Sequence, residues 1–406
     1  MINKKLKVGN VPNLRFPEFE GEWETKRLED LSEKIGDGLH GTPVYEDESD
    51  YYFINGNNLV NGRIEINENT KKVDIETFVK NNKGLKENSL LISINGTIGN
   101  IAKYRNEKVM LGKSVAYYNF YKNSDFFYFA LQTRLIQDFF NSELTGSTIK
   151  NLSLRTLRET YVSVPSDTEQ NKISCFLTLL DKRIQTQNKI IKELIVLKTT
   201  LAKRIFLQDL TFKDDKRDKF QKWQIKKLQD VCDVCGGGTP ETDKAEYWNG
   251  NIQWFTPTEI KSNYISRSER TISELGLKNS SAKLLPKGTI LLTTRATIGE
   301  VSIALEECTT NQGFQSLITK KDCNNIFLFN WLKMNKYKLV KRANGSTFSE
   351  ISKSEIEKIE IVFPSIEEQT KIANFLSSID SKIDNETQLL KKLEVQKKFL
   401  LQQLFV

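Results

Sequence analysis

The sequence predicts two related α/β (α+β) domains, each followed by a long helix, with the two helices paired as an antiparallel coiled coil. Three observations support this fold class. The two halves of the 406-residue chain repeat each other at an offset of about 200 residues. Each half closes with Pro-Ser-x-x-Glu-Gln-x-Lys-Ile, followed by apolar residues spaced alternately by four and three. Before each closing segment, short β-rich runs alternate with turns and helical stretches. A duplicated chain with antiparallel helices is pseudo-two-fold.

The composition argues against a membrane-spanning or generally disordered chain. Hydrophobic residues make up 38% of the sequence, and no apolar run approaches the roughly 18 residues that a membrane helix requires. The first residues lack the apolar core of a signal peptide, and five cysteines at this length indicate a reducing compartment, so we expect a cytoplasmic protein. The 60 Lys and Arg against 52 Asp and Glu give a net charge of +8, which allows a polyanionic partner such as nucleic acid without requiring one.

Residues 1–15 are expected to form an N-terminal arm and residues 16–165 the first domain. Within this domain, SLLISINGTIGNIAKY at 89–104 alternates apolar and polar residues around an Asn-Gly turn, which predicts strands. The stretch DFFYFALQTRLIQDFF at 125–140 predicts helix. The mixture indicates a compact domain with an irregular sheet.

Residues 166–207 predict the first long helix. It follows Pro165 and begins with Ser166 and Glu169, the spacing of a capping box in which both side chains bond backbone N–H groups. Its length corresponds to roughly 60 Å of helix, longer than an ordinary globular helix. A charged linker at 208–220 follows it.

The second domain at 213–364 and the second helix at 365–406 repeat this order. The Thr-Ile-Gly turn at 97–99, for example, recurs at 297–299. Two equivalent modules on one chain favour recognition of two sites at a fixed separation over a duplication without functional meaning.

Polar residues interrupt both apolar helix series at matching positions and predict the register of the helix pair. Gln187 and Lys198 interrupt the first series, and Glu386 and Lys397 interrupt the second. If partner residue numbers add to 584, Gln187 faces Lys397 and Lys198 faces Glu386. A shift by one heptad would set all four against aliphatic residues, at a cost of about 1–3 kcal/mol each. We therefore expect an antiparallel pair in this register that acts as a ruler between the two domains.

Glycine-rich motifs do not complete a nucleotide site. Residues 36–41 fit G-x-G-x-x-G, but Thr42 and Pro43 follow at once, where a dinucleotide-binding helix would have to begin. A tight loop, which recurs at 236–240, accounts better for both halves. Gly112-Lys113-Ser114 resembles the end of a P-loop, but a glutamate occupies the position of that motif's first glycine.

The sequence offers no complete catalytic or metal-binding set. Cys232 and Cys235 form a Cys-x-x-Cys pair, but Cys308 and Cys323 are isolated and His40 is the single histidine. No zinc site and no Ser-His-Asp arrangement is expected, and the Asn-Pro-Pro-aromatic tetrapeptide of amino-methyltransferases does not occur. We therefore expect a non-catalytic chain without a cofactor or metal of its own.

Basic and aromatic residues in or beside predicted loops are the candidates for DNA contact, although a solvated surface position remains the alternative for each. Arg295 occupies the place in the second half that Asn95 occupies in the first, a difference expected if the halves read different bases. The candidates are Arg63, Lys103, Tyr104, Arg105, Lys113, Arg267, Arg270, Arg295 and Lys320.

Together these features resemble the specificity subunit of a type I restriction-modification system over nearly the whole chain. They are the opening NLRFPEFEGEW, the Trp-x-x-Lys-Leu domain starts, the Thr-Ile-Gly turns, Gly-Ser-Thr at 146–148 and 345–347, and both Pro-Ser-x-x-Glu-Gln helices. The first domain departs from the pattern by starting Trp-Glu-Thr-Lys-Arg-Leu.

The resemblance implies that each domain is a target-recognition domain for one half of an asymmetric, interrupted sequence in double-stranded DNA. It implies that the helices set the spacer and dock two modification subunits, which use S-adenosylmethionine, and that two restriction subunits using ATP and Mg join the full complex. This subunit would carry no catalysis. Lys182, Arg183, Lys382 and Lys392 then become candidate partner contacts, with a solvated helix face as the alternative.

Two other functions remain open from the sequence. One is a free-standing regulator that binds two DNA sites, and the other is a coiled-coil scaffold with no DNA role. A regulator should bind specific DNA alone at physiological salt, whereas a specificity subunit should do so only with modification subunits present.

Overall fold

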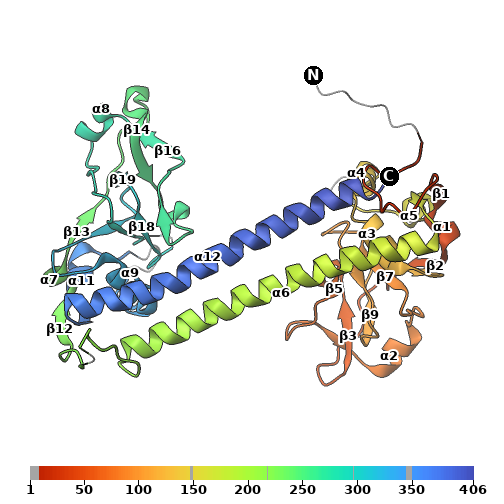
Figure 1. Ribbon diagram of the computed structural model, residues 1–406, viewed down its shortest axis with the longest axis horizontal. Coiled ribbons are helices and arrows are strands. Elements are labelled where there is room, and N and C mark those ends of the chain that lie inside the picture. The colour runs from red at the N-terminus through yellow and green to blue at the C-terminus, as the bar shows by residue number, and fades with distance from the viewer. Residues whose placement is uncertain (1–8, 147–149, 217, 296, 344–349) are drawn as a thin grey trace. The chain divides into compact units, whose positions relative to one another are not determined.

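The computed structural model describes residues 9–146, 150–216, 218–295, 297–343 and 350–406, and these form two compact units. Unit 1 comprises Met1–Asn188 with Gln388–Val406, and unit 2 comprises Lys189–Thr387. Each unit holds one mixed α/β domain and part of each long helix, α6 (Asp167–Phe206) and α12 (Ile366–Gln403) (Figure 1). The predicted fold class is confirmed. Most of the expected N-terminal arm and of both Gly-Ser-Thr segments, Ser147, Thr148 and Gly345 to Thr347 among them, lies outside the described residues.

The domain of unit 1 is built on an antiparallel four-stranded sheet in the order β2-β10-β7-β8. A smaller sheet, β6-β3-β9, packs beside it, and in that sheet β3 runs parallel to β9. The strands are β1 (Glu24–Arg27), β2 (Ser32–Asp37), β3 (Tyr51–Ile54), β4 (Leu59–Val60), β5 (Arg63–Ile64), β6 (Lys72–Val73), β7 (Ser89–Ser93), β8 (Ile101–Lys103), β9 (Val109–Leu111), β10 (Val115–Phe120) and β11 (Tyr161–Val164).

Short helices connect these strands. They are α1 (Leu28–Leu31), η1 (Gly56–Asn58), α2 (Ile75–Lys80), α3 (Ser124–Ala130), α4 (Arg134–Ser142) and α5 (Leu154–Glu159).

The domain of unit 2 repeats this plan. Its main sheet has the order β13-β20-β17-β18-β15, and its smaller sheet, β16-β14-β19, again pairs the middle strand parallel to the third. The strands are β12 (Gln224–Lys227), β13 (Cys232–Gly236), β14 (Trp248–Phe255), β15 (Tyr264–Ile265), β16 (Arg270–Ile272), β17 (Ile290–Leu292), β18 (Val301–Ala304), β19 (Cys308–Thr310), β20 (Gln315–Thr319) and β21 (Glu360–Phe363).

The helices of this second domain follow the same order as in the first, except that the second has one more, a 3-10 helix at Ala245–Tyr247. They are α7 (Leu228–Val231), η2 (Ala245–Tyr247), η3 (Pro257–Glu259), α8 (Glu274–Lys278), α9 (Asn325–Met334), α10 (Lys336–Lys341) and α11 (Lys353–Glu357).

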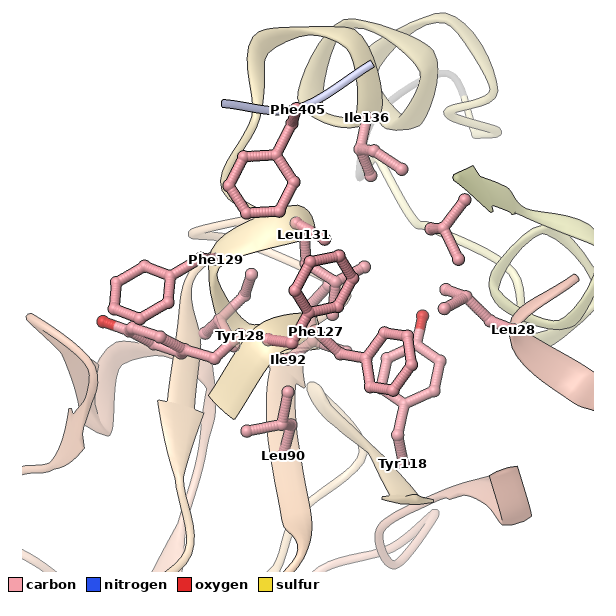
Figure 2. Close-up of a cluster of buried hydrophobic side chains, with 14 of the residues drawn as sticks. Leu28, Leu90, Ile92, Tyr118, Phe127, Tyr128, Phe129, Leu131, Ile136 and Phe405 are labelled. Carbon is pink, nitrogen blue, oxygen red and sulfur yellow. The ribbon is translucent and has the colours of Figure 1, made fainter. Parts of the chain in front are cut away.

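The last residues of the chain complete the core of unit 1. Leu404 and Phe405 are buried together with the aromatic residues of α3, and the Phe405 ring lies 5.3 Å from that of Phe126. Figure 2 shows Phe405 with Leu131 and Ile136 in this cluster. The backbone N–H of Leu14 donates to the carbonyl of Gln403 at 2.9 Å, so the segment before the first domain contacts the end of α12 in this unit.

The end of α6 makes the matching contribution to unit 2. Ala202 and Ile205 are buried in the second core with Phe327. Leu210 and Phe212 of the predicted charged linker also pack against this core, and the Phe212 ring lies 5.6 Å from that of Phe375. The core of each unit therefore needs the end of a helix that starts in the other half of the sequence.

Each long helix is anchored to its own domain by the glutamine of the repeated Pro-Ser-x-x-Glu-Gln motif. The buried Gln170 amide donates to the carbonyl of Pro165 at 2.8 Å and accepts from Asn123 at 3.0 Å. Gln369 likewise donates to the carbonyl of Pro364 at 2.9 Å and accepts from the backbone N–H of residue 324 at 2.9 Å. The motif therefore joins helix to domain in the same way twice.

Only the serine half of the predicted capping box is formed. Ser166 accepts from the backbone N–H of Glu169 at 3.4 Å, and the equivalent serine accepts from that of Glu368 at 3.3 Å. Both glutamates turn to other partners. Glu169 receives two hydrogen bonds, of 2.7 and 2.8 Å, from the Arg15 guanidinium, whereas Glu368 accepts from the indole of Trp223 at 2.9 Å.

The two glutamates therefore respond oppositely to the same substitution. Burial raises the pKa of Glu368, because a neutral indole offsets little of the cost of a buried charge. We expect Glu368→Gln to stabilise unit 2 at pH 7, with the gain fading as pH falls through the raised pKa and the wild-type carboxyl becomes protonated. Glu169→Gln should destabilise unit 1 by about 2–3 kcal/mol, because Arg15 loses its charged partner. Thermal unfolding at pH 4 and pH 7 measures both, and equal shifts for the two variants would contradict this assignment.

The ion pairs between the long helices correct the predicted register. In unit 1 Asp181 pairs with Lys397 at 2.7 Å, and in unit 2 Lys198 pairs with Asp380 at 2.6 Å. In both pairs the residue numbers add to 578, not 584. The prediction that Lys397 faces Gln187 and that Lys198 faces Glu386 is therefore wrong, because each long lysine side chain reaches an aspartate beside the apolar seam. Gln187 itself is buried, as a seam position requires.

Candidate nucleic-acid interface

The two Thr-Ile-Gly turns have the same internal hydrogen bonds. After β7, the backbone N–H of Gly99 donates to the Ser93 carbonyl at 2.9 Å, and the serine hydroxyl donates to the carbonyl of residue 97. After β17, Gly299 and Thr293 make the same backbone bond at 2.9 Å, and the threonine hydroxyl donates to the carbonyl of residue 297. Both glycines have φ of +85°, which disfavours any side chain there. The repeat thus preserves the backbone of the turn.

The side chain that each turn presents differs between the units. Asn95 is half-buried and follows β7, whereas the exposed Arg295 follows β17 and pairs with Glu350 at 2.9 Å. The side chains of this ion pair are 52% and 40% exposed, so water screens the attraction and the pair is weak. Arg295 is therefore held in place but remains able to exchange its partner.

The glycine-rich loops lie against the neighbouring strand at backbone distance. The N–H of Gly38 donates to the carbonyl of Val115 at 3.0 Å, and that of Gly238 donates to the carbonyl of Thr310 at 2.8 Å. A Cβ atom at Gly38 would lie 2.3 Å from the carbonyl oxygen of Leu111. The glycines therefore serve close backbone packing, in agreement with the tight loop expected from the sequence.

The turn that resembles a P-loop end has an internal structural role. The Ser114 hydroxyl accepts from the N–H of Gly56 at 2.9 Å and donates to Asn55 at 3.0 Å. Lys113 next to it is exposed. In unit 2 the equivalent turn carries the exposed Gln312, which accepts from Thr239 at 2.6 Å.

These three turns meet at one end of each main sheet, because two strands end there and the strand between them begins there. The N–H of residue 94 donates to the carbonyl of residue 114 at 2.9 Å, and that of residue 294 to the carbonyl of residue 313 at 2.8 Å. We call this the loop end. In unit 1 it comprises residues 38–43, 95–99 and 112–114, and in unit 2 residues 237–240, 295–299 (except 296) and 311–313.

Three candidates of the first half gather at the opposite end of that sheet, beside α6. Lys103 closes β8, forms an ion pair with Asp125 and lies 4.4 Å above the Tyr128 ring. Arg63 donates to Gln185 of α6. Arg105 also lies near Tyr128, whose pKa is raised, first by burial and then by the Asp181 carboxylate, with the positive charges of Arg105 and Arg63 opposing that shift. Arg63 thus connects the first domain to α6, and the other two cations lie around the Tyr128 side chain.

Tyr104 and Lys320 also lie away from the loop end. Tyr104 packs against the smaller core cluster of unit 1, and burial with the nearby Glu107 raises its pKa. Lys320 follows β20, donates to the carbonyl of Gln229 at 2.7 Å and lies 3.8 Å from Asp233. Of the nine candidates, the structure places Lys113 and Arg295 at the loop ends.

Arg267 and Arg270 belong to a second surface, around the smaller sheet of unit 2. Arg267 lies exposed between β15 and β16. The guanidinium of Arg270 stacks 3.5 Å above Trp248 and lies 5.6 Å from the ring of Trp254. Such an exposed cation on an aromatic face suits stacking with a base or contact with a phosphate.

The smaller sheet of unit 1 carries a similar surface that the sequence analysis missed. Three lysines there lie over three tyrosines, so this sheet replaces the Arg and Trp of unit 2 by Lys and Tyr. Adjacent Tyr-Tyr and Lys-Lys pairs are the sequence signal that indicates it. The contacts are Lys71 over Tyr45 at 5.7 Å, Lys108 over Tyr51 at 5.5 Å and Lys72 over Tyr52 at 5.7 Å.

The Cys-x-x-Cys pair is divided between two parts of unit 2. Cys232 lies in the main core, whereas Cys235 packs against a separate cluster, since residues three apart on a strand face opposite sides. Burial raises the pKa of Cys232 to about 12. Among the described residues, no group of three or more His, Cys, Asp or Glu side chains is arranged to hold a metal ion. Within the same residues, no helix has the length and apolar character needed to cross a membrane.

Comparison with known proteins places both halves in one family. A family model described as the type I restriction modification DNA specificity domain matches residues 20–195 and residues 221–395. The chain is 42% identical over 201 residues to the type I restriction enzyme MjaIX specificity subunit of Methanocaldococcus jannaschii, an alignment of 47% of this chain and 46% of that relative. It is 23% identical over 423 residues to the MjaVIII specificity subunit of the same organism, covering 97% and 94%. The chain thus matches about half the length of the first relative and nearly all of the second.

Solved structures have the same fold. The type I restriction-modification system S subunit from M. genitalium covers 98% of this chain and 99% of its own, with a TM-score of 0.60 and 17% identity. A structure from work on complex assembly and conformational transition of the type I R-M system covers 93% of this chain and 96% of its own, with a TM-score of 0.58 and 15% identity. At these identities the similarity is one of fold.

Proposed function

Because this chain belongs to the family of type I restriction-modification DNA specificity proteins, we propose that it is the DNA-reading subunit of a type I complex and carries no catalytic site. The observation that supports this proposal most is the duplicated loop end. The backbone of its turns is preserved between the units, whereas the polar side chains change from Asn95 and Lys113 to Arg295 and Gln312. Two domains that keep the same turn backbone but present different polar side chains are suited to recognising two different DNA sequences.

Each unit would read one half of an asymmetric, interrupted site in double-stranded DNA. The loop end would supply base contacts, and the cation-aromatic surface of the smaller sheet would supply contacts to phosphates or unstacked bases. Arg270 on Trp248 in unit 2 and Lys72 over Tyr52 in unit 1 are the central members of these surfaces.

The long helices would set the spacer between the half-sites and dock two modification subunits. Lys182, Arg183, Lys382 and Lys392 are exposed along them and remain candidate contacts. The modification subunits would bring S-adenosylmethionine, and two restriction subunits would bring ATP and Mg to the complete enzyme. This chain would contribute the choice of sequence.

Methylation mapping tests the proposal. The chain is expressed with its modification subunit in a host without other adenine methylation, and modified adenines are located by single-molecule sequencing. We expect one interrupted motif, which disappears when this chain is omitted. Absence of any chain-dependent motif, together with tight specific DNA binding by the purified chain alone, would replace the proposal with the free-standing regulator.

A further inference from the structure

The two Thr-Ile-Gly turns present different base-reading groups from equivalent positions. The turns share their backbone hydrogen bonds and the +85° glycine, so residues 95 and 295 leave the main sheet at the same place in each unit. One carries a neutral amide and the other a guanidinium. A contact to phosphate would favour a cation in both units, because phosphates are the same in every half-site. The exchange of Asn for Arg instead suits groups that read bases.

The chemistry of these side chains identifies the bases. In the major groove a guanidinium donates two hydrogen bonds to O6 and N7 of guanine, whereas an asparagine amide pairs with N6 and N7 of adenine. We propose, on the basis of the function proposed above, that Arg295 reads a guanine in the half-site of unit 2 and that Asn95 reads an adenine at the equivalent position in the half-site of unit 1.

The surroundings of Arg295 suit this role in the free protein. Its guanidinium is oriented by Glu350 at 2.9 Å while half of its side chain stays exposed. A carboxylate accepts the same kind of hydrogen bonds that guanine accepts. The ion pair with Glu350 therefore keeps the guanidinium N–H groups oriented until a base takes the place of the carboxylate. Asn95 is half-buried and forms a backbone bridge with Asn151, and no hydrogen bond of its side-chain amide occurs among the described residues, which leaves the amide available.

Base preferences of variants in complex with the modification subunit test the inference. In Arg295→Ala, preference for guanine at one position of one half-site should fall roughly 5- to 150-fold, with every other position unchanged. In Asn95→Ala, preference for adenine at one position of the other half-site should fall similarly. Asn95→Arg should shift that position from adenine toward guanine. Lys287→Ala, an exposed lysine at the opposite end of the unit 2 sheet, is the matched control and should leave the motif unchanged.

Several outcomes separate this inference from the proposed function. If the wild-type complex yields a motif but Arg295→Ala leaves it unaltered, or relaxes a base other than guanine, the inference is wrong while the function stands. If the wild type yields no motif, the proposed function itself fails. Arg295→Lys controls for misfolding, because lysine keeps the charge and the ion-pair partner but cannot form bidentate hydrogen bonds. This variant should still reduce the preference for guanine. Thermal unfolding of each variant should match the wild type.

Discussion

Replacing Phe405 by alanine is expected to lower the free energy of unfolding of unit 1 by about 3–5 kcal/mol. The side chain of this next-to-last residue is 6% exposed, and its ring packs against those of Trp23 and Phe126 at 6.3 and 5.3 Å. The cluster around it combines aromatic rings with aliphatic side chains such as Leu131 and Ile136 (Figure 2), and removing a ring from a core packed this closely leaves a cavity. The loss should be confined to unit 1.

Amide hydrogen exchange measures this effect unit by unit. Strands β7 and β10 should exchange faster in Phe405→Ala, whereas β17 and β20 should keep the wild-type rate. Phe399→Ala is the matched control, because this phenylalanine lies near the end of α12, six residues before Phe405, but is 55% exposed. If the two variants exchange alike, the end of the chain does not belong to the unit 1 core.

Replacing Lys198 by methionine is expected to destabilise unit 2 by about 3–5 kcal/mol, because it leaves the carboxylate of Asp380 charged and without its nearest cation. The two side chains are 13% and 11% exposed, and both carboxylate oxygens accept from the ammonium, at 2.6 and 2.7 Å. A pair so well removed from water loses far more on the deletion of one partner than a surface pair does.

A charge exchange tests the register directly. Lys198→Asp with Asp380→Lys should recover much of the stability that either change alone removes, as measured by chemical denaturation in a double-mutant cycle. Lys198→Glu with Glu386→Lys is the matched control and should show little coupling. Strong coupling in the control and none in the first pair would restore the register expected from the sequence.

The duplication and the heptad spacing carried most of the fold prediction. Equivalent motifs located both domains, and the apolar series predicted helices at 166–207 and 365–406, close to the observed Asp167–Phe206 and Ile366–Gln403. The register could not be read in the same way, because the prediction considered only residues on the apolar seam and left out the two aspartates that pair with the lysines. Asp181 and Asp380 pair with the two lysines and so indicate the register, but they lie beside the apolar seam and are not part of the heptad pattern.

The candidate site was predicted less well, and for a physical reason. Turn patterns indicate that Lys113 and Lys103 both follow or precede short strands, but strand order decides which end of the sheet each one occupies. The antiparallel pairing of β7 with β8 places Lys103 at the end of the sheet opposite the loop end, where it pairs with Asp125 of α3. Contacts such as Lys72 over Tyr52 join segments about 20 residues apart, and the sequence pattern gives only a weak indication of them.

The hydrogen bond between Leu14 and Gln403 joins the segment before the first domain to the end of the second long helix. The end of α12 meets the start of the first domain much as the end of α6 meets the linker before the second, with Leu210 and Phe212 against the core. At both junctions the core is completed by the end of the preceding long helix and the residues that follow it. We therefore expect the order of the two domains along the chain to matter little for the packing of either core.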